Sequence, residues 1–215
     1  MSVSVDPYSG ARAQNYHIHH SKSVRTRITT RREKYILKNL LRSVARIDRV
    51  ADVPCGSGRF WPVFESLGVQ TLIAGDASDN MLEVAGAHAP AIRCFDCRKL
   101  DLFDLDLPDN SVDAISCMRF LHHLSREQDR RVALHELYRT TNKYVVVSLW
   151  VDGNLQSSRR KIKTEKPVVP GFGPRRCFPR EQIEGEFVDA GFRIGRSVSV
   201  WPGLSMWRFY LLEKI

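Results

Sequence analysis

The stretch Arg49-Val-Ala-Asp-Val-Pro-Cys-Gly-Ser-Gly-Arg-Phe60 decides the fold. It joins a short apolar segment to a loop with two glycines, and an acid, Asp52, stands just before the turn. A second acid, Asp76, ends the next apolar segment, Thr71-Leu-Ile-Ala-Gly-Asp76. An α/β sheet that holds a ribose-bearing cofactor has this order of strand, glycine turn, helix, strand and acid. The stretch therefore predicts a binding site as well as a fold.

The glycine loop differs from a dinucleotide-binding turn. Such a turn has a third glycine, which lets the helix lie close to the strand and face a pyrophosphate. Trp61 stands at that position. Gly56 and Gly58 still permit positive φ angles and the close approach of a ligand. A pyrophosphate ligand is therefore disfavoured, although each glycine or acid taken alone is equally typical of an ordinary turn or cap.

Several segments, in this order, resemble the class I S-adenosylmethionine-dependent methyltransferases. Residues 49–60 resemble motif I, and Asp76 matches the acid that accepts hydrogen bonds from both ribose hydroxyls in that family. The segment 93–97 is similar to the one in which an acid, here Asp96, meets the adenine amino group and the next backbone N–H, here of Cys97, meets a ring nitrogen.

The resemblance extends over about residues 35–215, including a fourth strand with its lead-in at 107–117 and the turn at 118–124. It implies S-adenosylmethionine as the cofactor. The residues that it places around this methyl donor are Asp52, Cys55, Gly56, Gly58, Asp76, Ala77, Met81, Asp96, Cys97 and Met118. We add Arg31 as a hypothesis, since Arg31 and Arg32 could fold over the pocket and meet the cofactor's carboxylate.

The order of segments predicts a single Rossmann-like α/β domain. We expect a mainly parallel seven-stranded sheet with an antiparallel terminal strand and helices on both faces, because strands that alternate with helices require right-handed crossovers. The expected strands are 50–53, 71–76, 91–95, 112–117, 144–150, 193–200 and 206–212. Capping boxes predict helix starts at Thr30, with Glu33, and at Ser125, with Gln128. The acids at the strand ends are expected to share one pocket.

The 215 residues fit one domain with a formal net charge of +9. Residues 1–29 predict a flexible basic arm, and residues 30–215 a methyltransferase domain with a basic insertion at about 151–177. Basic segments of this kind attract RNA or an anionic surface. No apolar stretch is long enough to span a membrane, and no signal core begins the chain, so we expect a cytoplasmic protein.

The five cysteines are odd in number and irregularly spaced, which indicates reduced thiols rather than a disulfide framework. Cys94-Phe-Asp-Cys97 is a single C-x-x-C, for which a redox role remains an alternative to two small residues beside the adenine pocket. A histidine tract, at His17, His19 and His20, has no carboxylate or packed frame around it. We therefore expect no metal site.

His122 and His123 are the candidates for a catalytic base, since they follow the fourth strand and imidazole titrates near neutral pH. Both could instead be packing or hydrogen-bonding residues, and a general base is optional unless the acceptor begins as a hydroxyl or an ammonium. The prediction is methylation of an oxygen or nitrogen on a small or surface-presented anionic acceptor. The alternatives are an RNA methyltransferase and a non-catalytic, cofactor-binding subunit of a partner protein.

Overall fold

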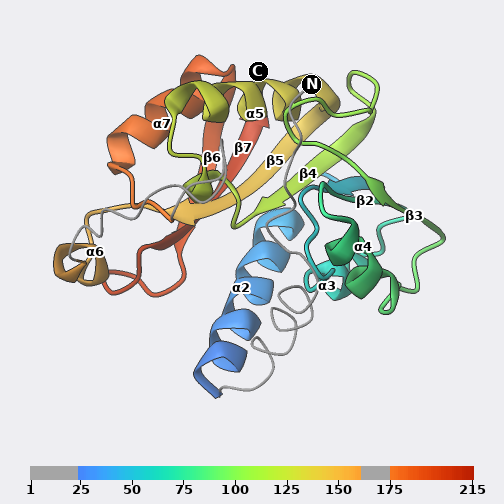
Figure 1. Cartoon of the computed structure of the whole chain (residues 1–215), viewed down its shortest axis with the longest axis horizontal. Coiled ribbons are helices and arrows are strands. Elements are labelled where there is room, and N and C mark those ends of the chain that lie inside the picture. The colour runs from blue at the N-terminus through green and yellow to red at the C-terminus, as the bar shows by residue number, and fades with distance from the viewer. Residues whose placement is uncertain (1–23, 161–174) are drawn as a thin grey trace.

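The computed structural model describes residues 24–160 and 175–215. They form one seven-stranded sheet in the order β3-β2-β1-β4-β5-β7-β6 (Figure 1). The strands are β1 (Arg49–Asp52), β2 (Thr71–Asp76), β3 (Cys94–Lys99), β4 (Val112–Met118), β5 (Thr141–Trp150), β6 (Phe192–Ser199) and β7 (Trp207–Lys214). The strand order reverses between β1 and β4, where an α/β sheet binds its ligands.

The strand directions confirm the predicted sheet. The pairs β1–β2, β1–β4, β2–β3 and β4–β5 are parallel, whereas β7 is antiparallel to both β5 and β6. In β5 the run Tyr144-Val-Val-Val is apolar on both faces, which suits a strand that is covered by helices on both sides.

Helices cover both faces of the sheet (Figure 1). They are α2 (Val24–Arg42), α3 (Trp61–Ser66), α4 (Asp79–Gly86), α5 (Glu127–Thr140) and α7 (Arg180–Asp189). The short helix α6 (Leu155–Arg159) buries none of its residues, and a 3₁₀ turn, η1 (Leu121–His123), follows β4. One hydrophobic core contains side chains of α5 and α7, and a second contains side chains of α2, α3 and α4.

Local signals set several helix ends. The Ser78 hydroxyl accepts a hydrogen bond from the Met81 N–H and caps α4. Gly68 and Gly191 follow α3 and α7 with φ of 74° and 92°, conformations that end a helix at little cost for glycine. Capping and glycine residues therefore set these helix ends.

Three expected boundaries are wrong. Helix α2 begins at Val24, so Thr30 lies inside it and caps nothing. Helix α5 has Arg126 at its N-cap position without a side-chain cap. Strand β3 runs over Cys94–Lys99, three residues later than expected. In each case tertiary packing of the segment outweighs the local signal.

Part of the predicted arm, 1–23, and part of the predicted insertion, 161–174, lie outside the described residues, as does the histidine tract. Within the described part of the chain, no helix is long and apolar enough to cross a membrane.

Candidate active site

Asp76 lies at the carboxyl end of β2 and is 7% exposed. Its Oδ2 accepts a hydrogen bond of 2.9 Å from the Gly56 N–H, and its Oδ1 accepts one of 3.0 Å from the Ser78 N–H. The carboxylate is thus fixed between the glycine loop and the start of α4. A fixed carboxylate at this edge of the sheet suits recognition of ribose hydroxyls.

The glycine loop is open at one glycine and packed at the other. Gly56 and Gly58 have φ of 55° and 69°. A Cβ at Gly56 would meet nothing within 4 Å, whereas a Cβ at Gly58 would lie 2.6 Å from the Trp61 ring. The loop therefore offers space for a ligand above Gly56, and Trp61 fills the space where a third glycine would allow a pyrophosphate.

Asp52, at the end of β1, is 1% exposed. Its Oδ2 accepts a hydrogen bond of 3.1 Å from Trp61 Nε1. The pKa of Asp52 is raised to about 7, mainly by burial and to a smaller extent by nearby Asp76, while the Ser116 hydroxyl, Trp61 and Arg59 act in the opposite direction. A cationic ligand beside this carboxyl would favour its ionised form.

Glu33 is a site residue that the sequence analysis treated as a helix cap. It is fully buried, and its Oε1 lies 2.5 Å from Arg119 Nη2. Its Oε2 lies 3.1 Å from Arg59 Nη2. Arg59 belongs to the glycine loop and Arg119 follows β4, so one carboxylate of α2 connects both parts of the site.

A signal for Glu33 was present in the sequence. Glu33 lies three and four residues before Ile36 and Leu37, which are both buried, so it continues the apolar stripe of α2. An acid on the buried stripe of a helix requires cationic partners. Arg31, two residues earlier, is exposed and lies on a different face of α2, so the structure does not bring it to Glu33 or the loop.

The register of β3 changes the assignment of the adenine-binding residues. Asp96 pairs with Ile73 in the middle of β2, is exposed, and forms an ion pair of 3.2 Å with Arg98. The prediction that Asp96 lies at the strand end is therefore wrong. Asp76 pairs with Lys99, so Asp101 is the acid that follows the end of β3.

The other predicted donor-site residues differ in burial. Cys55, Met81 and Met118 are buried, whereas Ala77 is exposed beside Asp76. The Cys55 thiol shares a hydrogen bond with Cys97, which raises the pKa of Cys55 and lowers that of Cys97.

The C-x-x-C motif does not form a thiol pair along its own strand. Cys94 and Cys97 are three residues apart on β3 and therefore point to opposite faces of the sheet. Cys97 faces Cys55 instead. The described residues hold no group of three or more His, Cys, Asp or Glu side chains that could bind a metal ion.

The acceptor side of the site, as we define it, is the aromatic cluster of His122, Trp150 and Trp207. His122 is 1% exposed and stacks on Trp150, with 5.2 Å between ring centroids. The Trp207 ring meets both other rings edge-on, and its centroid lies 5.0 Å from that of His122 and 5.4 Å from that of Trp150. Burial lowers the pKa of His122 well below its ordinary value, and His123, Arg175, Arg119 and Arg160 lower it further. His122 is therefore neutral at pH 7.

Guanidinium groups surround this cluster. Arg119 lies 4.5 Å from the centroid of Trp207, while Arg160 and Arg175 lie 4.5 Å and 5.7 Å from that of Trp150. Arg160 also donates a hydrogen bond of 2.7 Å to the Arg175 carbonyl. Of the three members of the cluster, only His122 stands out from the sequence, because Trp150 and Trp207 come from separate strands that only the fold brings together.

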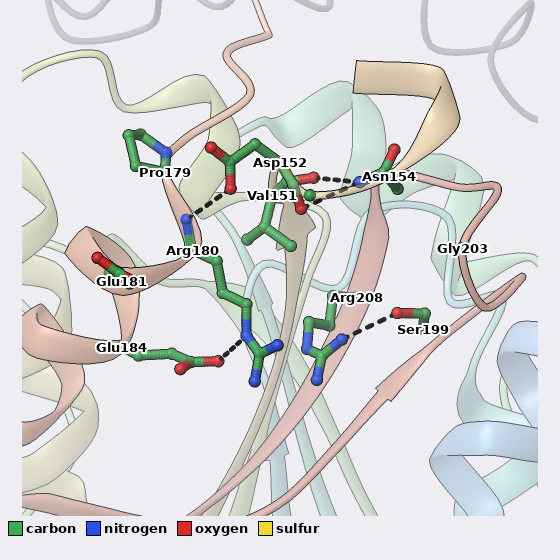
Figure 2. A pocket seen from close by; sticks show the side chains of 11 residues that line it. Val151, Asp152, Asn154, Pro179, Arg180, Glu181, Glu184, Ser199, Gly203 and Arg208 are labelled. Carbon is green, nitrogen blue, oxygen red and sulfur yellow. Dashed lines mark hydrogen bonds and ion pairs between the residues drawn. The ribbon is translucent and has the colours of Figure 1, made fainter. Parts of the chain in front are cut away.

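A cavity of about 640 Å³ opens beside the carboxyl end of β5 (Figure 2). In this cavity Arg180 Nε lies 2.7 Å from Glu184 Oε1. The backbone N–H of Arg180 donates a hydrogen bond to Asp152 Oδ1. Arg208 reaches the same space from β7 and donates a hydrogen bond of 3.0 Å to the Ser199 hydroxyl. None of the ion pairs among the described residues includes Arg208, so one guanidinium in the cavity has no carboxylate partner.

Comparisons with known proteins agree with this fold. Residues 51–147 match the family model described as a methyltransferase domain. The structure is similar to magnesium protoporphyrin IX methyltransferase from Synechocystis PCC 6803, solved with bound SAH. The two superpose with a TM-score of 0.74 at 14% identity, over 97% of this chain and 96% of that one. The fold is therefore that of the class I S-adenosylmethionine-dependent methyltransferases, and the segment 51–147 has the sequence pattern of a methyltransferase domain.

Two further proteins are similar. A methyltransferase from Haloferax volcanii, in complex with the Trm112 activator, has a TM-score of 0.65 at 15% identity, over 94% of this chain and 93% of that one. The tRNA (carboxymethyluridine(34)-5-O)-methyltransferase alkbh8 of Xenopus tropicalis is 29% identical over 129 residues, 59% of this chain. The chain matches 19% of the length of that relative.

The donor side fits the cofactor. Open space at Gly56 and the fixed carboxylate of Asp76 suit an adenosyl group, while the buried acids Asp52 and Glu33 suit its positive charges. S-adenosylmethionine, when bound, supplies a methyl group already activated on a sulfonium. The residues of this chain therefore need only to hold the donor and align an acceptor.

Proposed function

We propose that this protein is an S-adenosylmethionine-dependent methyltransferase that acts on an oxygen or nitrogen of an anionic acceptor, either a small molecule or a group presented on a larger surface. The observation that carries the proposal is the pair of arginines over the Trp150 ring, Arg160 and Arg175. Neither takes part in any of the ion pairs among the described residues. Guanidinium groups bind carboxylates and phosphates with paired hydrogen bonds.

The donor side of the proposal assigns Asp76 to the ribose, with Gly56, Gly58, Cys55, Ala77, Met81 and Met118 around the donor. Asp101 replaces Asp96 as the acid nearest the adenine. Arg59 replaces Arg31 as the group facing the donor's carboxylate, because it lies in the glycine loop and is 13% exposed. Holding donor and acceptor in line can supply about 7–11 kcal/mol of the barrier.

A neutral His122 supports an acceptor that is already negative. Because burial keeps its pKa low, the imidazole is a weak base. An anionic oxygen needs no proton removed before it attacks the methyl group, so His122 and His123 are assigned to shaping the acceptor side. An amine acceptor would instead require one of them as a base.

A second candidate is an RNA-borne acceptor, which the similarity to alkbh8 favours. The uridine named for that relative carries a carboxymethyl group, which is anionic. The exposed parts of Trp150 and Trp207 could stack on a base, as in single-stranded RNA recognition. A protein partner of the Trm112 kind is a further proposal, based on the Haloferax volcanii complex.

The test is to incubate the protein with radiolabelled methyl donor and fractionated cell extract, with Asp76→Ala protein as the control. Label that mild alkali releases as methanol indicates a methyl ester, the result expected for a carboxylate acceptor. Label in a fraction that ribonuclease destroys favours RNA. Tight donor binding without label in any fraction would contradict the proposal and favour the non-catalytic partner subunit.

We also propose a cytoplasmic location. All five cysteines are free, although Cys55 and Cys97 lie side by side. Free thiols are typical of reducing compartments.

A further inference from the structure

Three segments form one continuous edge of the molecule, which we call the basic apolar edge: residues 24–32 of α2, residues 155–160 with α6, and the β6–β7 turn, residues 200–206. Arg32 Nε donates a hydrogen bond of 3.3 Å to the Val200 carbonyl. The Leu155 N–H donates one of 2.9 Å to the Gly203 carbonyl. Figure 1 shows α6 beside this turn and α2 extending beyond the sheet.

The edge carries most of the exposed apolar side chains among the described residues. The described residues include nine exposed large hydrophobic side chains, and five of the nine lie in the three segments of the edge. The five are Val24 (69%), Ile28 (49%), Leu155 (43%), Trp201 (40%) and Leu204 (60%). Single exposed apolar residues are normal, but a group of them marks an interaction site.

The charges of the edge have one sign. None of the three segments contains an aspartate or glutamate. Arg27 and Arg31 of α2 are exposed, as are Arg159 and Arg160 at the end of α6. The edge therefore combines exposed aliphatic and indole groups with guanidinium groups and no carboxylate.

We propose that the basic apolar edge docks the protein on an anionic lipid bilayer. Aliphatic side chains and tryptophan partition into the interface of a bilayer, and arginines next to them pair with anionic headgroups. RNA would be bound by the arginines but gains little from exposed valine, isoleucine and leucine. Protein interfaces, in turn, are depleted of charge at their apolar centre.

Docking at this edge would turn the acceptor side toward the membrane. Arg160 ends the α6 segment of the edge and stacks on Trp150 of the aromatic cluster. Helix α2 contributes Glu33 to the site and Ile28 to the edge. An acceptor carried by a lipid would therefore meet the site from the docked side, although docking itself does not depend on which acceptor is methylated.

The experiment is co-sedimentation with two kinds of vesicle, one of phosphatidylcholine and one of phosphatidylcholine mixed with phosphatidylglycerol. We expect binding to the mixed vesicles. The double variant Leu155→Ser/Leu204→Ser keeps the charge and should bind at least about tenfold more weakly, since each buried methylene contributes to anchoring. Arg159→Gln should bind about fivefold more weakly. The matched control, Val188→Ser, removes an equally exposed apolar residue (60%) of α7 and should bind as the parent does.

Two results would overturn the proposal. One is the absence of binding to the mixed vesicles. The other is vesicle binding that falls in Arg159→Gln but stays unchanged in the double leucine variant. If the parent and the double leucine variant also bind single-stranded RNA more tightly than they bind the mixed vesicles, the edge binds RNA instead of a bilayer. Calorimetry with S-adenosylhomocysteine on each variant should give an unchanged dissociation constant. A failure to dock is therefore distinguishable from a failure of the donor site.

Discussion

The donor side and the acceptor side of the proposed site are built in different ways. On the donor side, Asp76 meets the N–H of Gly56, twenty residues earlier in the chain, and of Ser78, two residues later. On the acceptor side, Trp150 meets Trp207 across an antiparallel strand pair, and Glu33 reaches Arg119 from 86 residues away. Backbone turns therefore position the first side, whereas long-range packing of side chains positions the second.

The difference predicts which substitutions act locally and which disturb the whole site. Replacing Glu33 should lower the free energy of unfolding more than any other substitution proposed here, because Glu33 joins the two sides. Glu33→Ala leaves Arg59 and Arg119 without their buried carboxylate, and breaking a buried ion pair costs about 3–5 kcal/mol. Denaturant unfolding should show this loss.

Glu83→Ala is the matched control for Glu33→Ala. Glu83 is an exposed acid of α4 that takes part in none of the ion pairs among the described residues. Its replacement should change the free energy of unfolding by less than about 0.5 kcal/mol. Equal effects of the two substitutions would show that Glu33 does not join the two sides.

A comparison of alanine substitutions at Gly58 and Gly56 distinguishes the effect of backbone strain from the effect of packing on the donor side. Both have positive φ, so alanine is strained at either position by about 1–2 kcal/mol. At Gly58 the new Cβ also meets the Trp61 ring, which should cost about 1–3 kcal/mol more. In thermal unfolding, Gly58→Ala should have a lower melting temperature than Gly56→Ala. The reverse order would contradict the packing of Trp61 against the loop.

The same difference explains what could be predicted from the sequence. The glycine loop and Asp76 were found because their chemistry lies within short stretches of chain. Asp96 was misplaced because the expected strand was set by apolar residues, whereas β3 takes its bounds from pairing with β2. Arg59, Arg119, Trp150 and Trp207 were missed because no spacing rule connects residues that only the folded sheet brings together.

Asp76→Ala tests the donor side directly. The ribose would lose charge-assisted hydrogen bonds worth about 1.5–3 kcal/mol each, so the dissociation constant of S-adenosylhomocysteine should rise at least about tenfold in calorimetry. Asp96→Ala is the control and should bind normally, because Asp96 lies in the middle of its strand. An unchanged constant in Asp76→Ala would remove its assignment to the ribose.

The smallest effect concerns the proton on Asp52, whose pKa is raised to about 7 by burial. Below that pH the carboxyl is protonated, and above it the carboxylate attracts a positive donor. The affinity for S-adenosylmethionine should therefore rise severalfold as the pH increases from about 6 to about 8, within the limit of about tenfold per pH unit for one proton. S-adenosylhomocysteine lacks the sulfonium charge and should show a smaller rise. Asp52→Asn should remove the difference between the two ligands, and a difference that persists in this variant would place the proton on another group.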